Sequence, residues 1–153
     1  MNAIKEFFGN YMIIAPAAAW FSAQIIKVFT GMFRERKFSL TTMLFSNGGM
    51  PSSHSAAVCA LVAASAIRFG PASFELAISG LFAMIVMIDA LGVRYETGEQ
   101  AKIINKITKE LFSGRPDEIN TGLKELVGHT PFQVFVGAIW GIVVGILLSF
   151  VMN

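Results

Sequence analysis

The stretch Phe132–Met152 reads FQVFVGAIWGIVVGILLSFVM and contains no charged residue. A transmembrane helix needs about 20 consecutive, mostly apolar residues, and this segment meets the requirement without interruption. The first inference is therefore that the chain is a membrane protein whose last helix crosses the bilayer.

The composition of the whole chain agrees with this inference. Its 153 residues are 54% hydrophobic and 14% charged, with a mean hydropathy of +0.62, whereas about 25% of the residues in soluble domains are charged. The net charge of +2 is too small to indicate a nucleic-acid partner, and no basic-aromatic pattern is present. The single cysteine, Cys59, excludes an intramolecular disulfide and suggests no cysteine metal site.

Three further segments have the composition of membrane helices. Residues 11–33 are interrupted by two polar residues, residues 53–69 are short and rich in Ala, and residues 74–93 carry Asp89 near their end. The second and third segments also fit a helical hairpin of a soluble core, but the composition favours spans. We predict an all-α integral membrane helical bundle, a single domain over residues 1–153. Its four spans are predicted at about 11–33, 53–69, 74–93 and 132–152.

The connection before the last span is long and charged. Within it, apolar residues recur at helical spacing over residues 98–112, against a face with three lysines. This pattern predicts an amphipathic helix, which lies either on an anionic membrane surface or as a solvated cap over the domain. A second short helix is predicted over residues 117–127. The apolar residues of the predicted helix over residues 98–112 are Ala101, Ile104, Ile107 and Leu111.

Basic residues are unevenly distributed among the connections. Nine Lys and Arg residues lie in the first and third connections, and only Lys5 and Arg68 lie on the opposite side. By the positive-inside rule, the first and third connections and the amphipathic helix are cytoplasmic, and both termini are outside. The cell membrane is the expected location.

Two helix starts then face the cytoplasm. Residues 48–55 read GGMPSSHS and lead into the second span, while residues 128–131 read GHTP and open the fourth, with Thr130 as the expected N-cap. The free N–H groups and positive dipole at a helix start favour an anion. The only two histidines, His54 and His129, lie at these equivalent starts. The alternative is a pair of ordinary N-caps with structural histidines.

Charged residues are predicted at the same end of the bundle. Lys27 and Arg34 are seven residues apart and share a helix face, while Asp89 and Arg94 flank the end of the third span. Ionisable groups within spans cost a few kcal/mol each and are candidate functional residues. Alternatively, Lys27 snorkels to the interface, and Asp89 pairs with Lys27 or Arg94.

Residues 48–54, 89–94 and 123–131 read GGMPSSH, DALGVR and LKELVGHTP. Together these segments resemble the type 2 phosphatidic acid phosphatase superfamily, which also includes vanadium-dependent haloperoxidases. The resemblance is closest to the divergent small membrane branch of that superfamily and covers nearly the whole chain.

The first two catalytic motifs of the superfamily have counterparts here. Lys27 and Arg34 have the spacing of the motif K-x6-R-P, with Glu35 in place of the Pro. Residues 51–54 read PSSH and match the motif P-S-G-H, with Ser53 in place of the Gly.

The third motif, S-R-x5-H-x3-D, is matched by its histidine, His129. Leu123 stands at the position of the Arg, and Gln133 stands at the position of the Asp. The superfamily core has six helices, so a homo-oligomer is one way to complete a site built on four spans.

The resemblance implies a membrane phosphatase acting on a lipid phosphate or pyrophosphate monoester. His129 is expected to attack phosphorus and form a phosphohistidine, and His54 to protonate the leaving oxygen. Asp89 or Glu125 is expected to support His129. No metal or other cofactor is implied. The expected phosphate-binding residues are Lys27, Arg34, Ser52, Ser53, Arg94 and Gly128.

Two alternatives to an enzyme remain open. One is a non-catalytic lipid- or anion-binding protein, or a transporter, that retains the site. The other is a structural membrane subunit that associates through the glycines of Gly137-x3-Gly141-x3-Gly145, a spacing typical of close helix contacts. For these glycines we favour packing within the chain.

Overall fold

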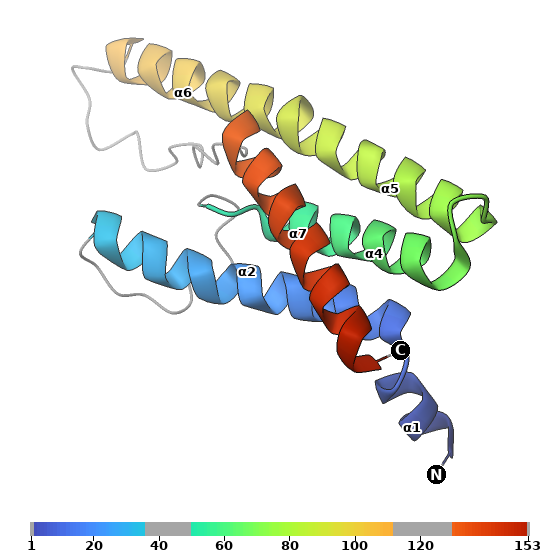
Figure 1. Ribbon diagram of the computed structural model, residues 1–153. Coiled ribbons are helices and arrows are strands. Elements are labelled where there is room, and N and C mark those ends of the chain that lie inside the picture. The colour runs from blue at the N-terminus through green and yellow to red at the C-terminus, as the bar shows by residue number, and fades with distance from the viewer. Residues whose placement is uncertain (1, 36–49, 112–129, 153) are drawn as a thin grey trace.

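The computed structural model describes residues 2–35, 50–111 and 130–152, which are helical apart from short turns (Figure 1). The predicted all-α fold is confirmed, and α1, which precedes the first span, is an addition to the predicted elements. The helices are α1 (Asn2–Phe8), α2 (Tyr11–Glu35), α4 (Ser53–Phe69), α5 (Phe74–Leu91), α6 (Val93–Leu111) and α7 (Pro131–Met152).

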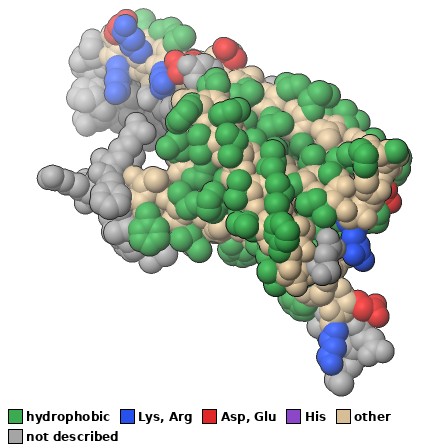
Figure 2. All heavy atoms as spheres, viewed as in Figure 1, with side chains coloured by type: hydrophobic (Ala, Val, Ile, Leu, Met, Phe, Trp, Pro, Cys, Tyr) green, Lys and Arg blue, Asp and Glu red, His purple; other side chains and the backbone are tan. Residues whose placement is uncertain are grey.

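Four of these helices coincide with the predicted spans. By length and composition, α2, α7 and the stretch that begins with α5 can cross a membrane. α4 is apolar but only 17 residues long, which corresponds to about 25 Å of helix against a hydrocarbon core of about 30 Å. Figure 2 shows apolar side chains over the middle of the molecule and charged side chains gathered towards its two ends, as expected for a bundle of membrane helices.

α4 is the central helix and packs against α2, α5 and α7. Its contact with α7 is the closest, because glycines face small residues. A Cβ at Gly137 or Gly141 would overlap the carbonyl oxygen of Ser52 or Ala56, and one at Gly145 would lie 3.0 Å from the carbonyl oxygen of Ala60. The contacts advance in the same direction on both helices, so α4 and α7 are parallel. The glycine face therefore packs within the chain, as the sequence analysis favoured.

α2 runs antiparallel to this pair. The Tyr11 hydroxyl donates to the backbone carbonyl of Gly145 (2.6 Å), and Trp140 Nε1 donates to Ser22 Oγ (2.9 Å). Alanines of α2 and α4 form the remaining contact, since Ala19 and Ala23 pack with Ala56 and Ala60. Small side chains allow helices to approach closely in a membrane, where packing rather than the hydrophobic effect holds them together.

α4 and α5 form an antiparallel hairpin. The turn contains Gly70, whose positive φ of 85° favours glycine, and Ser73, which accepts a hydrogen bond from the Leu76 N–H as the N-cap of α5. Apolar side chains close the interface, where Cys59 Sγ lies 4.0 Å from Met87 Sδ.

The predicted start of the amphipathic helix was wrong. α5 ends at Leu91, and α6 begins at Val93 and runs to Leu111 instead of beginning at residue 98. Figure 1 shows α6 continuing in the direction of α5. Gly98 is buried inside α6, and the Glu and Gln around it are good helix formers, so the helix passes through this glycine. The predicted helix over residues 117–127 lies outside the described residues.

Candidate functional site

The parallel pair and the two antiparallel helices bring four helix ends together. The starts of α4 and α7 lie at the same end of the bundle as the last turns of α2 and α5. Most of the polar residues singled out in the sequence belong to these ends. The geometry therefore places one candidate site at this end, built around the first turn of α4.

Hydrogen bonds fix the first turn of α4. Ser52 is the N-cap: its Oγ accepts from the Ser55 N–H (3.4 Å) and from the Ser55 hydroxyl (3.0 Å). The backbone N–H of Ser52 donates to the carbonyl of Gln133 on α7 (3.1 Å). Ser52, Ser53 and Ser55 are fully buried. The helix start is thus held rigidly beside α7, with its positive dipole end and first-turn N–H groups at the site.

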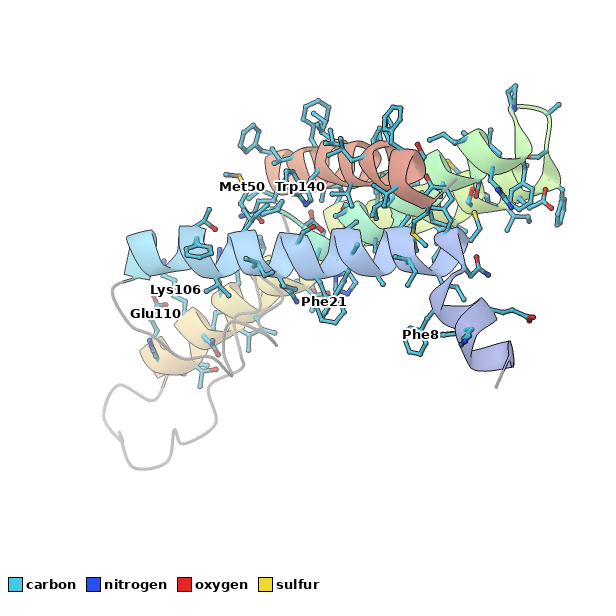
Figure 3. All side chains as sticks on the ribbon, turned by 60° about the horizontal axis from the view of Figure 1, so that its bottom comes forward. Phe8, Phe21, Met50, Lys106, Glu110 and Trp140 are labelled. Carbon is cyan, nitrogen blue, oxygen red and sulfur yellow. The ribbon has the colours of Figure 1, made fainter. Side chains whose placement is uncertain are left out.

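Lys27 reaches the same level from α2. One turn further along α2, Thr30 Oγ1 donates to the Met50 carbonyl (2.9 Å), and one turn earlier Ala23 belongs to the cluster that α2 forms with Ala56 and Ala60 of α4. This antiparallel register puts Lys27 level with Ser52 and Ser53. Met50 and Trp140 lie above α2 in Figure 3, towards α7, whereas Phe21 projects below it.

Lys27 is buried, with only 6% of its surface exposed. None of the ion pairs and side-chain hydrogen bonds found among the described residues involves its ammonium group. Of the two alternative partners of Asp89, Lys27 and Arg94, the pairing with Lys27 is therefore not found among the described residues. A buried ammonium group favours an anionic partner, because desolvating an unpaired charge is costly.

His54 and Asp89 lie at the edge of this region. His54 follows the buried Ser53 in the first turn of α4, yet its side chain is exposed. Asp89 is half-buried in the last full turn of α5, close to the level of that first turn, since Met87 contacts Cys59. Both residues take part in further interactions within the chain.

The start of α7 is capped reciprocally. The Thr130 N–H donates to Gln133 Oε1 (3.2 Å), and the Gln133 N–H donates to Thr130 Oγ1 (3.4 Å), which is a capping box. The predicted N-cap role of Thr130 is confirmed. The structural role of Gln133 was missed, although the spacing T-x-x-Q is the sequence signature of this motif.

Four expected site residues have no described side chain. Arg34 lies within α2 and Arg94 within α6, but only their backbone is described, and Gly128 and His129 fall outside the described residues. The motif position Leu123 and the acidic candidate Glu125 fall outside them as well. In the part of the chain that is described, no three His, Cys, Asp or Glu side chains form a metal-binding cluster.

The bundle of apolar helices, with two parallel helix starts that are hydrogen-bonded to each other, defines an integral membrane protein. Within this class the chain belongs to the divergent PAP2 family, whose family model matches residues 8–144.

The chain is similar to an uncharacterised membrane protein, YuiD, of Bacillus subtilis (strain 168). The two are 39% identical over 155 residues, which cover 95% of this chain and 98% of the relative. No solved structure matches the chain.

Proposed function

We propose that the protein is a membrane phosphatase that hydrolyses a lipid phosphate or pyrophosphate monoester. The observation that carries the proposal is the buried Lys27 ammonium at the level of the α4 N-terminus. A phosphate bound there would pair with the ammonium and with the positive ends of α4 and α7. Membership of the divergent PAP2 family supports the same chemistry.

In the proposed reaction, a ring nitrogen of His129 attacks phosphorus, and the bond between phosphorus and the ester oxygen breaks. His54 gives its proton to the leaving oxygen. Water then attacks phosphorus, the bond between phosphorus and the His129 nitrogen breaks with its electron pair returning to that nitrogen, His54 takes up a proton of the water, and inorganic phosphate leaves. Lys27, Ser53 and the helix N-termini stabilise the transferred phosphoryl group electrostatically. The remaining proposed phosphate ligands are Arg34, Ser52, Arg94 and Gly128, with Asp89 supporting His129.

A second function is favoured by one observation. The superfamily position that carries an Asp is Gln133 here, and its side-chain oxygen caps α7. A neutral amide gives an imidazolium no charge stabilisation. The alternative is therefore a protein that binds or transports a lipid phosphate or anion without turnover.

The test is phosphate release by detergent-purified protein from a panel of lipid phosphates and pyrophosphates, with His129→Ala as the control. Phosphate release by the wild-type protein but not by His129→Ala supports the proposed phosphatase activity. Equal binding of radiolabelled phosphate to wild type and His129→Ala, without release, supports the binding protein.

We further propose that the site lies on the cytoplasmic face of the cell membrane and that both termini are outside. The excess of Lys and Arg in the first and third connections supports this orientation. An impermeant thiol reagent applied to intact cells should label a cysteine placed at Lys5, in a Cys59→Ala background, and should leave Lys106→Cys unlabelled. The opposite pattern would reverse the orientation.

We also propose that the protein can form a homo-oligomer. Its subunit interface would have to use a face other than the glycines of α7, because these glycines already pack on α4.

A further inference from the structure

Gln24 is a second buried polar residue of α2, one turn before Lys27. The two residues are each only 6% exposed, and residues three apart are neighbours on the surface of a helix. Polar side chains inside a membrane span are costly and are candidate functional residues. The proposed phosphatase reaction gives Gln24 no role, although it is buried as completely as Lys27.

Gln24 and Lys27 lie on the side of α2 that faces away from Trp140 of α7. Trp140 Nε1 donates to Ser22 Oγ (2.9 Å). Because each residue turns the helix by about 100°, Ser22 is about 200° from Gln24 and about 140° from Lys27. Ala23, which packs with the alanines of α4, lies between these two sides. Gln24 therefore shares the side of Lys27 and lies one turn deeper in the span.

The amide oxygen of Gln24 is a buried acceptor. No described residue, Lys27 included, donates a hydrogen bond to Gln24 Oε1. Gln24 takes part in another interaction within the chain, so this observation concerns its oxygen alone. A buried acceptor that receives no hydrogen bond carries its full desolvation cost. A ligand that brings a donor to this place would remove that cost.

Phosphate can bring such a donor, and sulfate cannot. A fully ionised oxygen only accepts hydrogen bonds, so the Gln24 oxygen would repel it. A phosphate monoester has a second pKa of about 6 and readily carries one P–O–H group near neutral pH, as inorganic phosphate does. Sulfate and phosphate diesters carry none. A site whose buried polar group stays unpaired rejects such a ligand.

We propose that Gln24 Oε1 accepts a hydrogen bond from the protonated oxygen of a phosphate group bound at Lys27. Gln24 is then a specificity-determining residue that selects a phosphate monoester or inorganic phosphate over sulfate and over phosphate diesters. The proposal rests on the proposed function, because it takes the phosphate to be held at Lys27. The ammonium pairs with the negative charge of the ligand, and the amide oxygen pairs with its proton.

Anion competition tests the proposal without requiring turnover. Radiolabelled inorganic phosphate is bound to the purified protein at neutral pH and displaced by unlabelled phosphate or by sulfate. We expect wild type to bind phosphate more tightly than sulfate by roughly twentyfold or more. Gln24→Met, which removes the acceptor and keeps a side chain of similar length, should reduce this preference to less than about threefold.

Ser22→Ala is the matched control, because Ser22 is a polar residue of the same helix that bonds to Trp140. It should leave the preference for phosphate unchanged. Lys27→Met should weaken the binding of both anions together. An unchanged preference in Gln24→Met would overturn the proposal, and so would a wild type that binds both anions equally or binds neither. Gln24→Leu repeats the test if Gln24→Met does not fold.

Two short-chain lipids test whether the phosphate group belongs to a lipid. Dioctanoyl phosphatidic acid is a monoester, and dioctanoyl phosphatidylmethanol is a diester without a P–O–H group. Wild type should prefer the first as a competitor, and Gln24→Met should lose most of this preference. Equal competition by the two lipids on wild type would overturn the proposal. With the preference confirmed, tighter binding of phosphatidic acid than of inorganic phosphate supports a lipid headgroup as the ligand, and the reverse order supports free phosphate.

Hydrolysis by the same preparations separates this proposal from the phosphatase function. A preference that depends on Gln24, without hydrolysis of any lipid phosphate by wild type, would support the role of Gln24 and contradict the phosphatase. Hydrolysis by wild type, with the same preference in Gln24→Met as in wild type, would support the phosphatase and overturn the role of Gln24.

Discussion

The backbone N–H of Ser52 donates to the backbone carbonyl of Gln133 over 3.1 Å, so the first turns of two parallel helices are bonded directly to each other. Parallel helices place their positive ends side by side, which is unfavourable unless negative charge lies nearby. The glycine face of α7 permits this close approach. An anion bound beside the two helix starts would therefore stabilise the pairing.

Replacing Lys27 should separate stability from function. Because Lys in a membrane span costs about 2.5–3.5 kcal/mol at the bilayer centre, and Lys27 lies near the end of α2, Lys27→Met should increase the free energy of unfolding by about 1–2 kcal/mol. It should also abolish phosphate release. Thermal unfolding in detergent and a phosphate assay measure the two effects. Lys106→Met, at an exposed position of α6, should change neither, and a destabilised or fully active Lys27→Met would count against a ligand role.

The two serine N-caps offer a matched comparison. Ser52 caps α4 at the candidate site, and Ser73 caps α5 at the opposite end of the hairpin. Loss of an N-cap costs about 0.5–2 kcal/mol, so Ser52→Ala and Ser73→Ala should lower stability by similar amounts in denaturation experiments. Only Ser52→Ala should reduce phosphate release, by at least tenfold. Equal losses of activity would mean that Ser52 acts through stability alone.

The closest contact between α4 and α7 should be sensitive to a single methyl group. Gly141→Ala forces a Cβ into the Ala56 carbonyl, and overpacking of this kind costs about 1–3 kcal/mol. The melting temperature should fall accordingly. Gly80→Ala is the control, because nothing lies within 4 Å of its added Cβ and Ala is the better helix former. If both variants melt alike, the tight seam is not present in solution.

The buried Tyr11 hydroxyl should contribute measurably to the packing of α2. It donates to the Gly145 carbonyl over 2.6 Å, and a hydrogen bond between membrane helices is worth about 0.6–1.7 kcal/mol. Tyr11→Phe should lower the free energy of unfolding by about this amount, measured by denaturant titration in mixed micelles. Phe21→Leu, at a position 62% exposed on α2, should have a smaller effect, and the reverse order would argue against the observed position of α2.

The spans were predictable because apolar length is the main signal of a membrane helix. The parallel directions of α4 and α7 followed from counting spans. The junction of α5 and α6 was not predictable, since Gly98 suggests a helix boundary in sequence but is buried within α6. Helix propensity is a weak signal beside packing.

For the site, the sequence indicated Lys27 and Ser53 but gave no sign that Lys27 would be 6% exposed without an ion pair among the described residues. The burial of Lys27 depends on the register of α2 against α4. The packing of alanines of α2 on alanines of α4 sets this register, and it can be seen only in the folded structure. The spacing T-x-x-Q predicts the capping role of Gln133, but we interpreted Gln133 only as the counterpart of the Asp in the third catalytic motif.

The central claim is that this end of the bundle hydrolyses a phosphate ester. The most direct measurement is phosphate release from lipid phosphates and pyrophosphates by purified wild type, His129→Ala and Lys27→Met in parallel. We predict release by wild type on at least one substrate, and loss of release in both variants while each remains folded. No release by wild type above the His129→Ala background, on any substrate of the panel, would contradict the claim.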